Sequence, residues 1–207
     1  MNNAYPLNLP TLSTDLENKL LEFAYKFKSE ITAEGYNPEN DFGSIDAVKA
    51  DQYQKSTNMP RGYYRAVELP ADLTGAIKKE INNPALSKIN LYMQIMYADE
   101  GTPEFSLAPH IDFGRRVGFV YNLIEDAVKT NFHKLLINDK TRYAFSLEEI
   151  SEPIETYSFK THKWYVMNNT VPHSITNVTK TRIAVTSNVP MDYAGFCKRF
   201  STILIRD

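Results

Sequence analysis

The sequence predicts a mostly β protein with helices at its N-terminal end. From Lys88 onward, short runs rich in β-branched and aromatic residues recur between turn signals. Several short strands at this spacing are typical of a sandwich or barrel of antiparallel strands. A length of 207 residues suits one domain. We expect residues 1–87 to form a helical and loop segment that packs on a β-barrel formed by residues 88–207. The expected strands are 89–97, 117–123, 132–137, 156–159, 163–167, 173–177 and 182–189.

Two amphipathic helices are expected before these strands. Thr14 followed by Glu17 matches a capping box, and the apolar stripe after it predicts a helix over residues 15–34. A second helix is predicted over residues 72–82, because the Asn-Pro pair that follows ends it. Residues 37–60 are polar without a clear period, and are predicted to be loop with at most one short helical turn.

Charge and composition exclude several classes of protein. Twenty-three basic and 25 acidic residues give a net charge of −2, which disfavours nucleic acid as a partner. Cys197 is the one cysteine, so neither an intrachain disulfide nor a cysteine-ligated structural metal is expected. No apolar stretch approaches the roughly 18 residues of a membrane span, and the first ten residues do not resemble a secretory signal. We therefore expect a cytoplasmic protein.

The motif with the clearest chemistry is His110-x-Asp112. Residues i and i+2 of a strand point to one face, so the imidazole and the carboxylate can converge on one point. Two nitrogens and one oxygen on one face of an octahedron suit ferrous iron and leave three positions open. The second imidazole must come from elsewhere, and His173 is the best candidate among the four histidines. His110, Asp112 and His173 are therefore the predicted Fe(II) ligands.

Arg182 is predicted to bind an anion. It follows His173 by nine positions and begins an apolar, alternating strand. A guanidinium that projects into a barrel is costly unless a buried anion meets it, and a carboxylate held by two hydrogen bonds is the natural partner. Ile183 and Val185 oppose Arg182 on this strand, and periodicity alone leaves open which face is the inner one. An exposed charge on an edge strand is the alternative.

The order of these residues resembles a known enzyme family. H-x-D, a histidine sixty-one positions later and an arginine nine further on resemble the iron(II)/2-oxoglutarate-dependent dioxygenases, over roughly residues 88–190. Residues 89–123 look most like the prolyl-hydroxylase branch, which also occurs in bacterial and viral genomes, and Tyr97 occupies the place of a tyrosine of that branch. The resemblance implies a double-stranded β-helix, a jelly-roll or cupin-like barrel with the metal at its mouth.

The same resemblance implies the cosubstrates and the reaction. The cosubstrates are 2-oxoglutarate and O2, and the far carboxylate of 2-oxoglutarate pairs with Arg182, helped by the hydroxyl of Tyr97. A C–H bond of the substrate is hydroxylated, and 2-oxoglutarate is converted to succinate and CO2. Asn122 lies on a strand that can face the cosubstrate, and is a further candidate contact.

The sequence departs from the family at three places. Many members carry a serine two residues after the arginine, where this chain has Ala184; Thr186, on the same expected strand face, is the candidate substitute. Leu107 stands where prolyl hydroxylases often have a tyrosine. Residues 127–130 replace the Gly-Gly-Glu-Thr stretch of the branch. These differences leave the predicted metal ligands intact but weaken the transfer of prolyl specificity.

Most of these residues also have a purely structural interpretation. His173 also suits a core or turn histidine. Arg116 and Trp164 are candidate substrate contacts, although a solvated strand start and core or rim packing respectively explain them more readily. His133 and His162 are expected to be packing or surface residues rather than ligands.

Three functions remain open on the sequence. The leading one is a 2-oxoglutarate-dependent hydroxylase that acts on a protein side chain, such as proline, or on a small molecule. A cupin-type metal enzyme without 2-oxoglutarate usually needs a His-x-His pair followed by Glu, which this chain lacks. A non-catalytic β-barrel that binds a ligand or protein would use the histidines for structure alone. The apolar run 193–205 suits a closing strand, a packing helix or a partner surface, so the oligomeric state is open.

Overall fold

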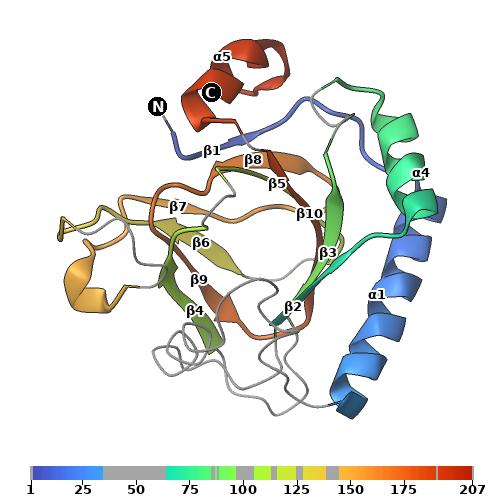
Figure 1. The fold of residues 1–207 in the computed structure, drawn as a ribbon, viewed down its shortest axis with the longest axis horizontal. Coiled ribbons are helices and arrows are strands. Elements are labelled where there is room, and N and C mark those ends of the chain that lie inside the picture. Colours follow the sequence, from blue (N-terminus) through green and yellow to red (C-terminus); the bar gives the residue numbers. More distant parts are fainter. Residues whose placement is uncertain are drawn as a thin grey trace.

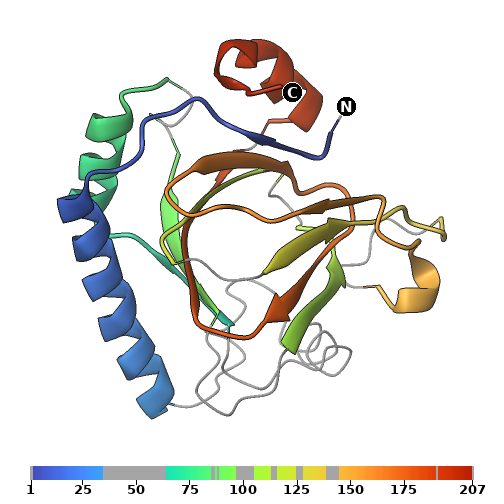
Figure 2. The same ribbon diagram turned by 180° about the vertical axis from the view of Figure 1, so that it is seen from behind.

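Two antiparallel β-sheets dominate the structure, a computed structural model that describes residues 2–34, 64–84, 87, 89–96, 105–112, 116–124, 128–138, 145–189 and 191–206. The predicted mostly β architecture with antiparallel strands is confirmed. The smaller sheet lies on the side of the larger sheet that is turned away from the two long helices (Figures 1 and 2). Closure of the two sheets into the barrel of a double-stranded β-helix stays a prediction.

The larger sheet has six strands in the order β1-β8-β5-β10-β3-β2. Strand β10 is central and pairs with β3 on one side and β5 on the other. Its bounds equal those predicted from the alternating pattern, because a buried central strand has the most regular spacing of apolar residues. The bounds are β1 Ala4–Pro6, β2 Tyr64–Glu68, β3 Leu91–Met96, β5 Val117–Asn122, β8 Trp164–Asn168 and β10 Arg182–Val189.

The smaller sheet has four strands in the order β4-β9-β6-β7. Strands β4 and β9 pair with register shifts, so β4 is bulged along its length. The strand predicted over 132–137 is wrong in position, because β6 ends at Phe132 and Leu135 forms only an isolated bridge with Ile150. The bounds are β4 Phe105–His110, β6 Lys129–Phe132, β7 Glu155–Tyr157 and β9 His173–Val178, with a short 3₁₀ helix, η1, at Leu147–Glu149.

Helices cover the outer face of the six-stranded sheet (Figure 1). Helices α1 (Thr14–Glu34) and α4 (Ala71–Ile81) agree with the predicted ranges to within one residue. Their apolar stripes join the sheet in one core cluster that includes Ile183 and Val185 of β10, both fully buried. Burial of these faces against a sheet supplies the tertiary packing on which most helical stability depends.

The inner face of the six-stranded sheet looks toward the smaller sheet. Ala184 of β10 and Val120 of β5 form a second core cluster with Phe132 of β6, which belongs to the other sheet. Because side chains alternate along a strand, Arg182 shares the face of Ala184 and not that of Ile183. The structure therefore settles the question that periodicity left open, and Arg182 points between the two sheets.

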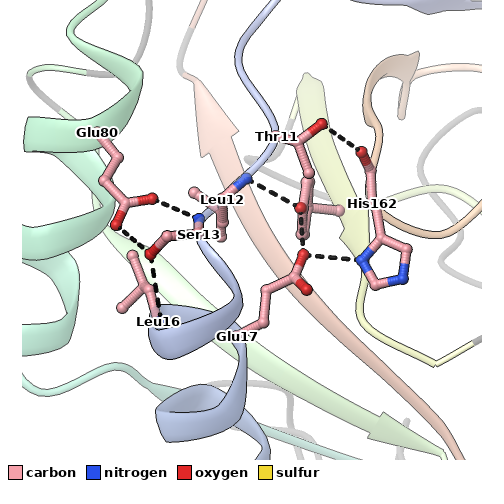
Figure 3. A network of polar contacts seen from close by, with 8 residues as sticks. Thr11, Leu12, Ser13, Leu16, Glu17, Glu80 and His162 are labelled. Carbon is pink, nitrogen blue, oxygen red and sulfur yellow. Dashed lines mark hydrogen bonds and ion pairs between the residues drawn. The ribbon is translucent and has the colours of Figure 1, made fainter.

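A polar network holds the start of α1 on the sheet (Figure 3). The predicted capping residue is wrong, because the Ser13 hydroxyl, and not that of Thr14, accepts the backbone N–H of Leu16 at 3.3 Å. The Glu17 carboxylate instead accepts hydrogen bonds from the Tyr121 hydroxyl at 2.5 Å and from His162 Nδ1 at 2.8 Å. A sequence match to a capping box cannot reveal that a distant tyrosine and histidine compete for the glutamate.

The N-terminal 87 residues contribute more than helices. Strands β1 and β2 are the two edge strands of the six-stranded sheet. Neither was predicted, because both are short and pair with strands far along the chain. The proposed boundary at residue 87 stays a prediction. The prediction for residues 37–60 lies outside the described residues.

The apolar C-terminal run forms a packing helix. Helix α5 (Tyr193–Arg199) and the 3₁₀ turn η2 (Ser201–Ile203) add Tyr193, Phe196 and Cys197 to the helix-side core. Across the described residues, every helix is too short or too polar to cross a membrane. Both chain ends lie at the same side of the molecule, beside β1 and α5 (Figure 1).

Candidate metal centre

Two histidines face each other across neighbouring strands. His110 is the last residue of β4, His173 is the first residue of β9, and the two are paired in register. Directly opposed residues of an antiparallel pair place their side chains on the same face, which brings the two rings together. Their ring centroids lie 4.4 Å apart, and both residues are buried. Two residues sixty-three positions apart thus become neighbours through strand pairing.

Asp112 completes the group from a position just beyond the strand. The prediction assumed that His110 and Asp112 share one strand, but β4 ends at His110. Asp112 is instead held by its backbone N–H, which donates to the carbonyl oxygen of Asn169 at 3.2 Å. Its Oδ1 lies 3.8 Å from His110 Nε2. Convergence therefore depends on a backbone hydrogen bond to Asn169 rather than on strand alternation.

The three side chains offer a donor set that fits a metal ion. One ligand atom each from His110, Asp112 and His173 lies within 4.8 Å of the others. Metal–nitrogen and metal–oxygen bonds of about 2.1 Å place ligand atoms roughly 3–4 Å apart, so small side-chain movements would close the group on an ion. Two imidazoles and one carboxylate are a donor set that suits non-heme Fe(II).

His173 is prepared to act as a neutral ligand. Its Nδ1 lies 3.0 Å from the carbonyl oxygen of Val171. A carbonyl can only accept, so Nδ1 carries the hydrogen and Nε2 keeps a free lone pair. Burial, followed by the nearby His110, lowers the pKa of His173 to about 4, so the ring is neutral at pH 7.

The two other histidines have different neighbours. His133 is buried, with Nδ1 at 2.9 Å from the Ser151 carbonyl and Nε2 at 2.9 Å from the Ser174 hydroxyl, and burial lowers its pKa. His162 is exposed and pairs with Glu17. Both are packing or surface residues in the part of the chain that the structure describes.

Arg182 lies buried on the inner face, with 4% of its surface exposed. Its Nη1 donates to the Gln94 side-chain oxygen at 3.2 Å and contacts Met96 Sδ at 3.8 Å. The alternative of an exposed edge-strand charge is therefore wrong. The inner face also borders the histidines. The ring centroids of Phe132 and His173 lie 6.0 Å apart, and Phe132 shares a core cluster with Ala184.

The structure describes two of the three remaining candidate cosubstrate contacts. Asn122 and Thr186 lie on the inner face, where Asn122 pairs with Ala184 and Thr186 pairs with Val120. The Asn122 amide nitrogen already donates to the carbonyl of Phe159 at 2.6 Å, and its oxygen has no hydrogen-bond partner in the described part of the chain. Tyr97 lies outside the described residues.

The two candidate substrate contacts differ in exposure. Trp164 is fully buried on the helix-covered face, with its ring centroid 4.8 Å from that of Tyr121. The indole thus belongs to the helix-side core, on the opposite face of the sheet from the histidines, and its role as a substrate contact stays a prediction. Arg116 is exposed, and its carbonyl oxygen accepts the backbone N–H of Asn169 at 3.2 Å.

Sequence reasoning missed two polar residues of the site. Gln94 orients Arg182, and Asn169 Nδ2 donates to Asp112 Oδ2 at 3.0 Å. Both lie in stretches without a motif, and each meets its partner only through tertiary packing. No local signal distinguishes them from surface amides.

The comparisons with known proteins establish the fold alone. The sequence matches no protein-family model and no curated protein sequence. The non-heme α-ketoglutarate-dependent epimerase SnoN from nogalamycin biosynthesis superposes with a TM-score of 0.55 at 12% identity, over 90% of this chain and 77% of SnoN. A Trichoplax adhaerens prolyl hydroxylase, solved with a hypoxia inducible factor peptide, gives 0.51 at 13% identity, over 91% of this chain and 83% of that one. The E. coli ycfD structure gives 0.43 at 12% identity, and the match spans 67% of this chain and 37% of that chain.

Proposed function

We propose that this chain is an oxygenase that depends on Fe(II) and 2-oxoglutarate. The observation that carries the proposal is the convergence of His110, Asp112 and His173 across β4 and β9. The buried Arg182 on the adjoining inner face supports it, because a diacid cosubstrate needs a cation at its far end. The likeness to α-ketoglutarate-dependent and hydroxylating enzymes agrees with this class by analogy of fold.

Each of the three candidate ligands contributes one donor atom. His110 and His173 each present a ring nitrogen, and Asp112 presents one carboxylate oxygen. Val171 holds His173 in the tautomer that leaves Nε2 free. Fe(II) held by these groups supplies O2 activation for C–H oxidation, coupled to conversion of 2-oxoglutarate to succinate and CO2.

Arg182 has the role of receptor for the far carboxylate of 2-oxoglutarate. Its guanidinium is buried and contacts Gln94 and Met96, so a carboxylate that reaches it is shielded from water. Shielding strengthens the ion pair relative to one at the surface. Gln94 keeps the guanidinium oriented, which reduces the conformational freedom lost on binding. Thr186, Tyr97 and Asn122 are proposed as additional contacts.

The proposed substrate is a protein side chain or a small molecule. SnoN has been solved with Fe3+, α-ketoglutarate and nogalamycin RO, and the Trichoplax enzyme with a peptide. A prolyl side chain is the best single candidate for this chain, although Leu107 departs from the prolyl-hydroxylase pattern. Arg116, at the exposed start of β5, is the proposed substrate contact.

The decisive experiment is spectroscopic. Anaerobic protein with Fe(II) and 2-oxoglutarate is expected to develop the weak visible charge-transfer band of a chelated 2-oxo acid. His110→Ala should abolish the band, whereas His162→Asn, an exposed histidine substituted by a residue that tolerates its positive φ of 56°, should retain it. A band in both variants would mean that the iron binds elsewhere.

The same measurement separates the alternatives. A cupin-type enzyme without 2-oxoglutarate would bind Fe(II) tightly yet show no band with this diacid. A non-catalytic binding protein would show neither iron binding at His110 nor a band. Either result in folded wild-type protein would overturn the proposed function.

A further inference from the structure

Asn169 lies outside the candidate ligand set and donates a hydrogen bond to the Asp112 carboxylate. It follows β8, and 3% of its surface is exposed. Its backbone carbonyl accepts the Asp112 N–H at 3.2 Å, and its Nδ2 donates to Asp112 Oδ2 at 3.0 Å. Its own N–H donates to the Arg116 carbonyl at 3.2 Å, which ties the residue to the start of β5. Asp112 is thus held at both its main chain and its side chain by one residue.

The amide of Asn169 is not explained by stability. Its Oδ1 is buried and makes no hydrogen bond to the described residues, which costs free energy of folding. Its Nδ2 makes its side-chain hydrogen bond to the carboxylate of Asp112. Polar groups that violate a local packing rule occur most often where function requires them. An apolar side chain in this position would avoid the orphaned oxygen.

Gly118 of β5 makes room for this amide. A Cβ added at Gly118 would lie 2.8 Å from Asn169 Oδ1 and 2.9 Å from Asn169 Nδ2. Such contacts are shorter than van der Waals separation, so any larger residue would displace the amide. The absence of a side chain at Gly118 of β5 therefore makes space for the amide of Asn169, which follows the neighbouring strand β8.

We propose that Asn169 is the positioning residue of Asp112, and that Gly118 permits it to act. The hydrogen bond from Nδ2 occupies Asp112 Oδ2, so Oδ1, the oxygen nearer to His110, is left for the ion. Because the donor is neutral, the carboxylate keeps its full charge for the metal. This inference rests on the proposed metal site and adds to it the element that selects which carboxylate oxygen binds.

The test measures Co(II) binding rather than turnover. Asn169→Ala in the full chain is expected to weaken Co(II) affinity by about 10–100-fold, the usual effect of removing a group that hydrogen-bonds a ligand. The visible Co(II) absorption should also change in shape, because a released carboxylate can bind through both oxygens. Loss of a merely structural side chain would not alter the ligand-field spectrum.

Two further variants locate the effect. Gly118→Ala should weaken Co(II) binding in the same direction while retaining every side chain of the site, and Gly75→Ala, where an added Cβ meets nothing within 4 Å, serves as the matched control. In the Asn169→Ala background, Gly118→Ala should cause little additional loss, because the amide that it displaces is already absent. Non-additivity of this kind identifies residues that act through one another.

The outcomes are distinguishable from failure of the proposed function. If the wild-type protein binds no Co(II), or binds it equally well after His110→Ala, the metal site itself is wrong. If the wild type binds Co(II) at His110 but Asn169→Ala retains its affinity and spectrum, the positioning role is overturned. Asn169→Leu, which keeps the branching and the number of side-chain heavy atoms and removes the orphaned oxygen, replaces Asn169→Ala if the latter does not fold, and the same results apply to it.

Discussion

The two faces of strand β10 differ in chemistry although they alternate residue by residue. Ile183 and Val185 face the helices, fully buried in the apolar core. Arg182 and Ala184 face the smaller sheet, where the guanidinium meets Gln94. The outer face is a closed packing surface, whereas the inner face carries polar groups together with apolar ones and adjoins the two opposed histidines.

This difference teaches that one strand can serve stability and binding independently. Substitutions on the outer face should change the free energy of unfolding and leave ligand affinity unchanged. Substitutions on the inner face should change ligand affinity with smaller effects on stability. Each prediction below compares the two faces, from the largest expected effect to the smallest.

The largest effect is expected for Phe119→Ala on the outer face. Phe119 is fully buried, with its ring edge-to-face against Phe196 at 5.3 Å. Truncation leaves a cavity, and the free energy of unfolding should fall by about 3–5 kcal/mol in a urea titration of metal-free protein. Co(II) affinity per folded molecule should stay within about twofold, and a loss of tenfold or more would show that the two faces are coupled.

On the inner face, Arg182→Met should weaken binding rather than stability. Charge-assisted hydrogen bonds contribute about 1.5–3 kcal/mol, so 2-oxoglutarate affinity should fall roughly 10–150-fold in calorimetric titration of metal-loaded protein. The unfolding free energy should change little, since replacing a buried charge by an apolar side chain is often neutral. The neighbouring Ile183→Val should do the reverse, with about 0.5–1.5 kcal/mol of destabilisation and unchanged affinity. Equal effects of the two variants on 2-oxoglutarate would contradict the assignment of faces.

A smaller change is expected for Tyr121→Phe, where the outer face meets the N-terminal segment. The Tyr121 hydroxyl donates to Glu17 and accepts the Leu12 N–H at 3.1 Å. Its loss should lower the unfolding free energy by about 1–2 kcal/mol, because the Leu12 N–H is left without its acceptor. Binding of 2-oxoglutarate should not change, and any change would mean that α1 influences the inner face.

The same substitution should alter how the free energy of unfolding depends on pH in alkaline solution. Burial, followed by the hydrogen bond to Glu17, raises the pKa of Tyr121 above its ordinary value of 10.0. Above pH 10 the unfolded phenol loses its proton while the folded one keeps it, so stability falls as pH rises. Tyr121→Phe should reduce this slope between pH 10 and 11, measured by urea titration. An unchanged slope would assign it to other tyrosines.

The smallest effect is expected for Ala184→Ser on the inner face. Many enzymes of the resembled family carry a serine here, and Ala184 pairs with Asn122, whose side-chain oxygen makes no hydrogen bond to the residues that the structure describes. One added donor contributes about 0.5–1.5 kcal/mol, so 2-oxoglutarate affinity should rise roughly two- to tenfold. A fall in affinity would indicate that the diacid does not approach this strand.

Much of the fold could be predicted because local sequence patterns indicate it. The bounds of β10 follow from alternation over eight residues, and those of α1 and α4 from helical spacing and end signals. Strands β1 and β2 could not be found, since a short strand becomes one only when a distant partner pairs with it. The site divides in the same way, because the H-x-D motif is local whereas Asn169 and Gln94 gain their roles from contacts across the sheets.

The sequence by itself determined the kinds of chemistry available, namely two imidazoles, a carboxylate and a guanidinium in a β-rich chain. Only the tertiary structure decided how they are used. The β4–β9 register opposed His110 and His173, and Asn169 anchored Asp112 beyond the strand where alternation no longer applies. Alternation separates the two faces of a strand but cannot say which is the inner one. The packing of the layers decides this: helices cover the face of Ile183, and a second sheet covers the face of Arg182. Burial depends on which layers meet and not on the strand alone.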